Sequence, residues 1–128
     1  MKLLLDTHIF LWFILNDQRL TESARVSIET ESNEIFLSSV SVWEIAIKYQ
    51  LNRLPLPKPP GVFIPEQRAI NRIQSLPLDE ASATHVQQLP LHHSNPFDRM
   101  LICQALVQDL TLVSVDAAIQ KYSVKLLT

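Results

Sequence analysis

Four acidic residues, far apart along the chain, stand beside segments with strand-like or helix-like patterns. Asp6 follows the apolar run 2–5, Glu44 and Asp98 each lie early in a helical segment, and Asp116 follows a second strand-like run. Carboxylates without accompanying cysteines or a histidine pair suit hard cations, Mg²⁺ or Mn²⁺. Such ions serve phosphate chemistry by activating water and neutralising the phosphate. If the fold gathers the four acids, they predict a divalent-metal centre acting on a phosphodiester.

Each of these acids also has an ordinary structural alternative. Glu44 completes the spacing of a capping box with Ser41, which is a purely structural role. Asp98 lies in a first helical turn, where an acid interacts favourably with the helix dipole. The other two acids could cap a helix or occupy a turn. Four carboxylates gathered at one place in the fold are harder to explain in this way, because like charges in a low-dielectric cleft repel one another unless they share a cation.

The elements that must position these acids alternate along the chain. Short apolar runs are typical of strands buried on both faces, and longer runs with helical spacing lie between them. The alternation predicts one α/β domain over residues 1–128, with a parallel sheet of four to five strands and helices on both faces. Strand ends and helix starts share one edge of such a sheet, so the four acids should meet there. We predict strands at 2–5, 34–38, 75–78, 111–115 and 124–127, and helices at 9–15, 22–31, 41–51, 62–73, 80–89, 96–109 and 116–122.

Composition excludes several classes of protein. The chain has 128 residues and is 47% hydrophobic and 19% charged, which is typical of a globular domain and not of a disordered chain. One glycine, Gly61, is too few for a glycine-rich phosphate loop. One cysteine, Cys103, excludes a disulfide framework and favours a reducing compartment. A net charge of −2 means that any nucleic-acid binding must rely on a local basic patch or on a metal.

The first sixteen residues also invite comparison with a secretion signal. Asp6 and His8 interrupt the apolar region, and the polar residues that follow make a poor cleavage site. The apolar run is also too short to span a bilayer. We therefore expect a cytoplasmic protein with no membrane association.

Several further residues have a predicted supporting role. Ser114, two residues before Asp116, has a hydroxyl that could orient a carboxylate or a metal-bound water. The adjacent His92 and His93 resemble a metal pair, but neighbours in a loop rarely chelate one ion, and we expect both at the surface.

Basic residues that could contact a nucleic acid form a second group. Lys48, Arg53 and Lys58 form a basic run after Glu44 that could steer a nucleic acid toward the acids, with an ordinary solvated face as the alternative. Arg99 adjoins Asp98 and is a further possible phosphate contact, although a surface role is equally compatible with its position.

The chain contains four distinctive blocks, LLLDTHIFLW, SSVSVWEIAIK, LPLHHSNPFDRMLICQAL and TLVSVDAAIQKYSVKLL. Together they resemble PIN-domain proteins, and most closely the VapC-like toxins of bacterial type II toxin–antitoxin systems. The resemblance spans nearly the whole chain and is weakest at the proline-rich stretch 52–62. The combination of blocks in this order is highly specific for the family, whereas any one block alone would be modest evidence.

The resemblance implies a PIN-like three-layer α/β/α fold and a Mg²⁺- or Mn²⁺-dependent endoribonuclease that cleaves RNA with metal-activated water. The family's four acids match Asp6, Glu44, Asp98 and Asp116, which would be both catalytic and metal-binding, and a small hydroxyl residue often stands where Ser114 is. One departure is Asn95, where the family commonly has an acid before Pro-Phe-Asp-Arg. This change removes a nearby negative charge, unless Asn95 simply caps the helix.

The resemblance also implies a cognate antitoxin as partner. The segment IFLWFIL at 9–15 is apolar nearly all round, so it must be core or be covered by an antitoxin or a second copy, and we expect a homodimer. Two alternatives remain open at this point, a non-toxin PIN-like metal-binding module and a receiver-type signalling domain. A receiver would have adjacent acids after its first strand and a lysine after its fifth, and this chain has neither.

Overall fold

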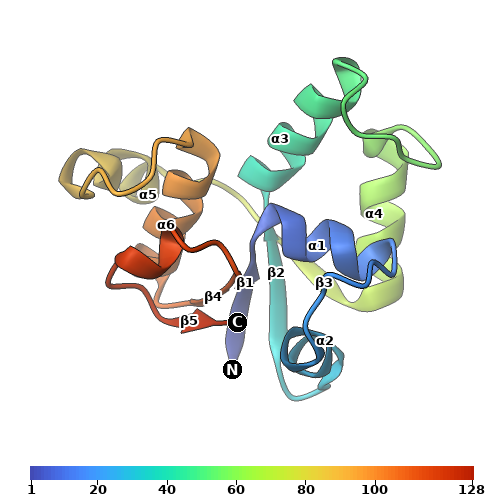
Figure 1. The fold of residues 1–128 in the computed structure, drawn as a ribbon, viewed down its shortest axis with the longest axis horizontal. Coiled ribbons are helices and arrows are strands. Elements are labelled where there is room, and N and C mark those ends of the chain that lie inside the picture. The colour runs from blue at the N-terminus through green and yellow to red at the C-terminus, as the bar shows by residue number, and fades with distance from the viewer.

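A five-stranded parallel sheet forms the centre of the computed structural model, which describes residues 1–128 (Figure 1). The strand order is β3-β2-β1-β4-β5, and every neighbouring pair is parallel. The predicted parallel sheet is therefore confirmed. Its strands are β1 (Lys2–Leu5), β2 (Glu34–Ser38), β3 (Ile73–Leu76), β4 (Thr111–Val113) and β5 (Leu126–Leu127).

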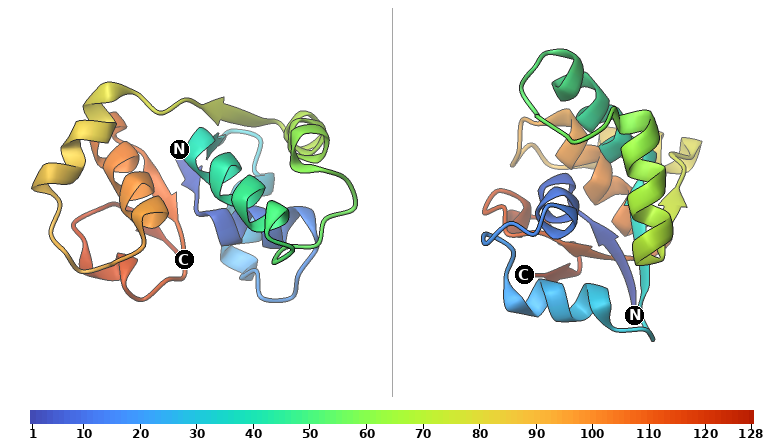
Figure 2. Two further views of the ribbon diagram at one scale, coloured as in Figure 1. Left: turned by 90° about the horizontal axis from the view of Figure 1, so that it is seen from above. Right: turned by 90° about the vertical axis from the view of Figure 1, so that its right-hand side faces the viewer.

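Helices cover both faces of this sheet and complete the predicted three layers. α1, α2 and α4 lie on one side with much of α3, whereas α6 lies on the other with α5 packed against it (Figures 1 and 2). The helices are α1 (Thr7–Ile14), α2 (Glu22–Glu29), α3 (Ser39–Gln50), α4 (Pro60–Asn71), α5 (Glu80–His85) and α6 (Pro96–Gln108), with 3₁₀ turns η1 (Val86–Gln88) and η2 (Ile119–Lys121). None of the helices has both the length and the apolar composition needed to cross a bilayer.

The central strand β1 supplies side chains to two separate cores. Leu3 and Leu5 pack in the cluster under α1 and α2, whereas Leu4 packs in the cluster under α6, and all three are fully buried. A strand covered on both faces needs apolar residues at every position, which explains the continuous run in the sequence.

The chain order places a crevice at the carboxyl ends of the central strands. From β1 the chain moves outward to β2 and β3, then returns to the other side of β1 to form β4 and β5. Such a reversal is where open α/β sheets bind ligands. Asp6 directly follows β1, α3 directly follows β2, and Ser114 directly follows β4, so all three border this crevice.

The start of α3 differs from the prediction. The helix begins at Ser39, and its cap is Ser38, whose Oγ accepts the N–H of Val40 at 3.0 Å. Ser41 lies inside the helix, where its Oγ accepts a hydrogen bond from the Thr7 hydroxyl at 2.9 Å. The predicted capping box is therefore wrong, and Glu44 has no capping role.

Other boundaries shift by a few residues. The third strand lies at Ile73–Leu76 instead of 75–78, and α4 begins at Pro60, so Pro65 lies beyond the first turn. The predicted helix 80–89 tightens into a 3₁₀ turn after His85. The predicted helix 116–122 is only the 3₁₀ turn η2.

Candidate metal centre

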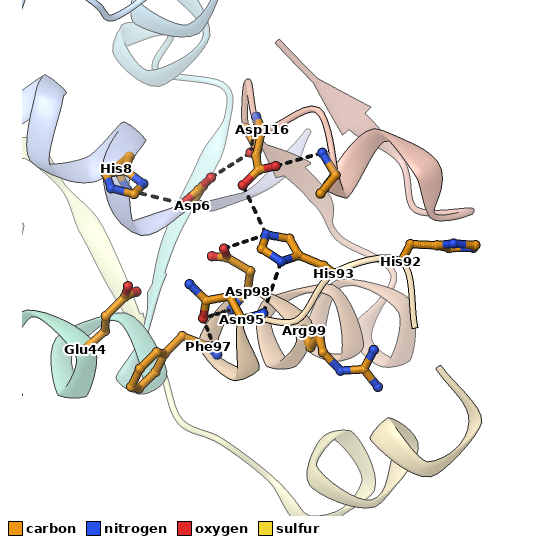
Figure 3. A network of polar contacts seen from close by, with 12 residues as sticks. Asp6, His8, Glu44, His92, His93, Asn95, Phe97, Asp98, Arg99 and Asp116 are labelled. Atoms are coloured by element: carbon orange, nitrogen blue, oxygen red, sulfur yellow. Dashed lines mark hydrogen bonds and ion pairs between the residues drawn. The ribbon is translucent and has the colours of Figure 1, made fainter. Parts of the chain in front are cut away.

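The four predicted acids come together at the carboxyl ends of β1, β2 and β4, and we call them the acidic edge. Figure 3 shows Asp6, Asp98 and Asp116 directed toward one another, with Glu44 facing them from α3. Three of the four are almost fully buried, at 4% exposure for Asp6, 2% for Glu44 and 6% for Asp98. A site of this kind concentrates negative charge where water cannot screen it.

Asp6 is held from both sides. It is the N-cap of α1, where Oδ1 accepts the N–H of His8 at 3.2 Å. Its other oxygen, Oδ2, accepts a hydrogen bond from the Ser114 hydroxyl at 2.6 Å. Burial nevertheless raises the pKa of Asp6 above its ordinary value. The structural and chemical roles weighed for this residue are therefore compatible, because capping uses one oxygen and leaves the carboxylate at the edge.

Ser114 connects two of the acids. It is fully buried, and besides donating to Asp6 its Oγ accepts the backbone N–H of Asp116 at 3.1 Å. The Asp116 carboxylate in turn accepts the N–H of Ala118 at 2.8 Å. Burial alone would raise the pKa of Asp116, but this N–H and the ring of His93 lower it below its usual value. Ser114 thus orients a carboxylate, one of the two roles considered for it.

Asp98 lies in the first turn of α6. Asn95 caps this helix through Oδ1, which accepts the N–H groups of Phe97 at 2.9 Å and Asp98 at 3.4 Å. Asn95, which departs from the family pattern, is therefore a helix cap. Burial, followed by the nearby Asp6 and Glu44 carboxylates, raises the pKa of Asp98 to about 7. A carboxylate with such a pKa is poised to exchange its proton for a cation at neutral pH.

Glu44 is the buried acid with a carboxylate oxygen that is both buried and unpaired. Its Oε2 accepts a hydrogen bond from Lys48 at 2.9 Å, one helical turn away. Its Oε1 is buried without any hydrogen-bond partner. A buried carboxylate oxygen left unpaired is costly, and such groups are rare in native proteins. This orphaned oxygen, near the Asp6 and Asp98 carboxylates, fits a site for Mg²⁺ or Mn²⁺, which prefer hard oxygen ligands.

His93 is the residue that the sequence analysis misplaced. His92 is exposed as expected, but His93 is largely buried, and its Nε2 lies 3.0 Å from Asp98 Oδ2 and 3.1 Å from Asp116 Oδ2 (Figure 3). The cue available in the sequence was its position two residues before Asn95. A helix that begins at the acidic edge brings the loop before it to the same edge.

The predicted RNA contacts lie in different surroundings. Arg99 is buried, points away from the acids (Figure 3), and donates to the carbonyls of Leu89 and Pro90 and to the Tyr122 hydroxyl. Its place favours anchoring of the loop before α6 and disfavours a phosphate contact. Lys48, 39% exposed, lies at the acidic edge through its pair with Glu44.

The remainder of the basic run lies beyond α3. Arg53 is exposed and its side chain makes no hydrogen bond or ion pair, whereas Lys58 pairs with Glu66 at 3.0 Å. Arg53 therefore keeps a free guanidinium for a ligand.

Comparison with known proteins places this arrangement in a family. The family model described as PIN domain matches residues 3–125, which is nearly the whole chain. The chain belongs to the PIN domain family. The sequence resemblance is thereby confirmed, and the receiver-domain alternative is wrong.

One curated relative agrees with the VapC-like part of the resemblance. Over 61 residues, 48% of this chain, it is 36% identical to Ribonuclease VapC16 of Mycobacterium tuberculosis, and the match covers 43% of that protein. The chain therefore matches less than half of that relative's length.

Solved structures similar to this chain share its fold along nearly its whole length. VapBC2 from Rickettsia felis, bound to a promoter DNA fragment, superposes with a TM-score of 0.72 at 16% identity, covering 99% of this chain and 98% of that one. DNA-bound VapBC from Salmonella typhimurium gives a TM-score of 0.70 at 19% identity, covering 99% and 97%. At these identities the likeness shows the fold.

Proposed function

We propose that this PIN-domain protein is a Mg²⁺- or Mn²⁺-dependent endoribonuclease and the toxin of a type II toxin–antitoxin module. The observation that carries the proposal is the buried acidic edge, in which one Glu44 oxygen has no partner in the protein. The name of the matched relative, Ribonuclease VapC16, supports RNA as the substrate.

Asp6, Glu44 and Asp98 would hold the ion, with Asp116 contributing directly or through water. When bound, the ion would supply an activated water and neutralise the scissile phosphate. The chain's own residues prepare this site. Ser114 holds Asp6 in place at 2.6 Å, and Asp98 loses its proton when a cation replaces it, so binding should release a proton near pH 7.

The surface beside Glu44 supports a place for RNA. Lys48 and Arg53 offer positive charge to phosphates on the α3 side. Trp43 is 61% exposed, and its ring packs edge-on against Phe97 with 5.2 Å between ring centroids. An exposed indole fixed next to the acids offers a base a stacking surface that does not depend on net charge. We therefore expect a single-stranded or unpaired segment at the cleavage site.

The proposed toxin has two expected protein partners. The similar structures from R. felis and S. typhimurium are VapBC complexes, which supports a cognate antitoxin for this chain. In α1, Trp12, Phe13 and Ile14 are only partly buried, so a partner still has apolar surface to cover. A homodimer and a cytoplasmic location remain predictions. Light scattering after size exclusion, with and without the antitoxin, tests the assembly.

The function is tested by RNA cleavage with the purified chain. We expect cleavage with Mg²⁺ or Mn²⁺, none with EDTA, and at least a hundredfold loss in Asp6→Asn, since metal catalysis contributes several kcal/mol. Glu29→Gln, at an exposed acid of α2, is the matched control and should keep full activity. Expression in a host should arrest growth unless the antitoxin is present. Unchanged cleavage in a folded Asp6→Asn would overturn the proposed site.

A further inference from the structure

His93 bridges two acids, and its hydrogen-bonding state is defined by its other ring nitrogen. The backbone N–H of Asn95 points at Nδ1 of His93 over 3.1 Å. A backbone N–H can only donate, so Nδ1 must accept and cannot carry a hydrogen. The ring hydrogen is therefore on Nε2.

This tautomer determines what His93 offers the acids. Nε2 lies 3.0 Å from Asp98 Oδ2 and 3.1 Å from Asp116 Oδ2, so its N–H is shared between the two carboxylates. A metal ligand would need a free lone pair on Nε2, and the hydrogen would then have to move to Nδ1. The Nδ1–H of His93 and the backbone N–H of Asn95 would then be two donors facing each other over 3.1 Å, with no acceptor between them.

These three side chains resemble a metal site in their spacing alone. One ligand atom each from His93, Asp98 and Asp116 lie within 4.8 Å of one another. Spacing alone does not show whether His93 is a metal ligand or a hydrogen-bond donor, whereas its tautomer does. A nitrogen ligand would also favour a transition metal such as Mn²⁺ over Mg²⁺, and a donor would not.

The loop that carries His93 is anchored through its backbone. The backbone N–H groups of His92 and His93 both donate to the Tyr122 hydroxyl oxygen, at 3.0 and 2.9 Å. Arg99 contacts the same hydroxyl at 3.3 Å and the carbonyl of Pro90 at 2.8 Å. The ring thus has a defined place between two acids that come from separate elements, α6 and the segment after β4.

We propose that His93 is a positioning residue that sets the separation of Asp98 and Asp116 through one shared Nε2–H and does not itself bind the metal. This inference rests on the proposed metal centre. It assigns the cation only oxygen ligands from the protein, and it explains how Asp98 and Asp116 keep their orientation when no ion is present.

The test is metal binding to the whole chain, without RNA. Pulsed electron paramagnetic resonance of bound Mn²⁺ should show no directly coordinated nitrogen in the wild type. By calorimetry, His93→Ala should weaken Mg²⁺ and Mn²⁺ by the same factor, about tenfold, as expected for a residue that orients ligands. His93→Gln, which returns an N–H near the position of Nε2, should stay within about threefold of the wild type. His92→Ala, at the exposed neighbour, is the control.

Three results would overturn the inference and leave the nuclease proposal in place. They are a coordinated-nitrogen signal in the wild type, a larger loss of Mn²⁺ than of Mg²⁺ affinity in His93→Ala, and wild-type affinity for both ions in that variant. The wild-type spectrum decides the matter even if the alanine variant does not fold. Failure of the wild type to bind either ion would instead overturn the metal centre, and this inference with it.

Discussion

The two sides of the acidic edge are built differently. On the β4 and α6 side, Asp98 and Asp116 share the His93 ring, and Ser114 and backbone N–H groups hold the neighbouring carboxylate oxygens. On the α3 side, Glu44 has one lysine partner and one oxygen with none. The protein thus organises one side before anything binds and leaves the other side to be completed by a ligand. Glu44 should therefore depend most on the ion, and Asp116 least.

The largest expected effect separates these two acids directly. Glu44→Gln should lower metal-dependent cleavage by more than about a hundredfold, because an ion ligand worth several kcal/mol is lost. Asp116→Asn should cost about tenfold, because this side chain is 35% exposed and already bonded to Ala118 and His93. The measurement is the initial cleavage rate at saturating Mn²⁺. Equal losses in the two variants would contradict the difference between the sides.

Asp98 should make the metal-free protein less stable as pH rises. The folded chain keeps this proton up to about pH 7, whereas the unfolded chain loses it near 3.8. The unfolded state therefore binds fewer protons between these values, and stability falls as pH rises through that window. Asp98→Asn should remove this fall and raise the melting temperature at pH 8 by about 5 °C or more.

Thermal melting of the metal-free protein from pH 4 to 8 checks this prediction. Below pH 4 the melting temperatures of the wild type and Asp98→Asn should converge, since Asp98 is protonated in both the folded and the unfolded state. Saturating Mg²⁺ should stabilise the wild type and leave Asp98→Asn almost unchanged. A lower melting temperature for Asp98→Asn than for the wild type at pH 8 would show that burial and the neighbouring carboxylates do not destabilise the ionised Asp98.

Lys48 should contribute more to stability when the ion is absent than when it is bound. Lys48→Met leaves the buried Glu44 without its remaining partner, which should cost about 1–3 kcal/mol in metal-free protein. Because an ion would satisfy the same carboxylate, Mg²⁺ should narrow this difference. Urea unfolding with and without Mg²⁺ measures it, with Lys58→Met as the control at an exposed pair. An identical cost in both conditions would mean that Glu44 does not face the ion.

The smallest predicted effect concerns substrate binding on the α3 side. Trp43→Ala should raise KM for RNA about fivefold with kcat nearly unchanged, since one stacked base contributes roughly 1 kcal/mol or more. Leu51→Ala, at a similarly exposed residue following the same helix, should leave KM unchanged. A shift of the oligomeric state in Trp43→Ala would assign this surface to a protein interface instead.

Several features of this molecule were visible in the sequence because they depend on local pattern. β2 lies at Glu34–Ser38 as predicted, and β1 at Lys2–Leu5, because a strand buried on both faces needs an uninterrupted apolar run. The meeting of the four acids follows from topology, since parallel strands end and the helices between them begin at one edge of the sheet.

What could not be predicted depends on contacts between distant segments. Both Ser38 and Ser41 suit a cap, and the choice is made by their partners, Gln104 on α6 and Thr7 on α1. Arg99 follows Asp98 in sequence but points elsewhere, because successive residues of a helix are about 100° apart. The place of His93 required a loop path that no local pattern describes.

The central claim, that the acidic edge holds a divalent ion, is tested most directly by an anomalous difference map from a crystal soaked in Mn²⁺. The account predicts a peak within ligand distance of Asp6, Glu44 and Asp98, with Glu44 Oε1 among the ligands and no bond from His93. No peak at this edge, or a peak bound only by surface carboxylates elsewhere, would contradict it.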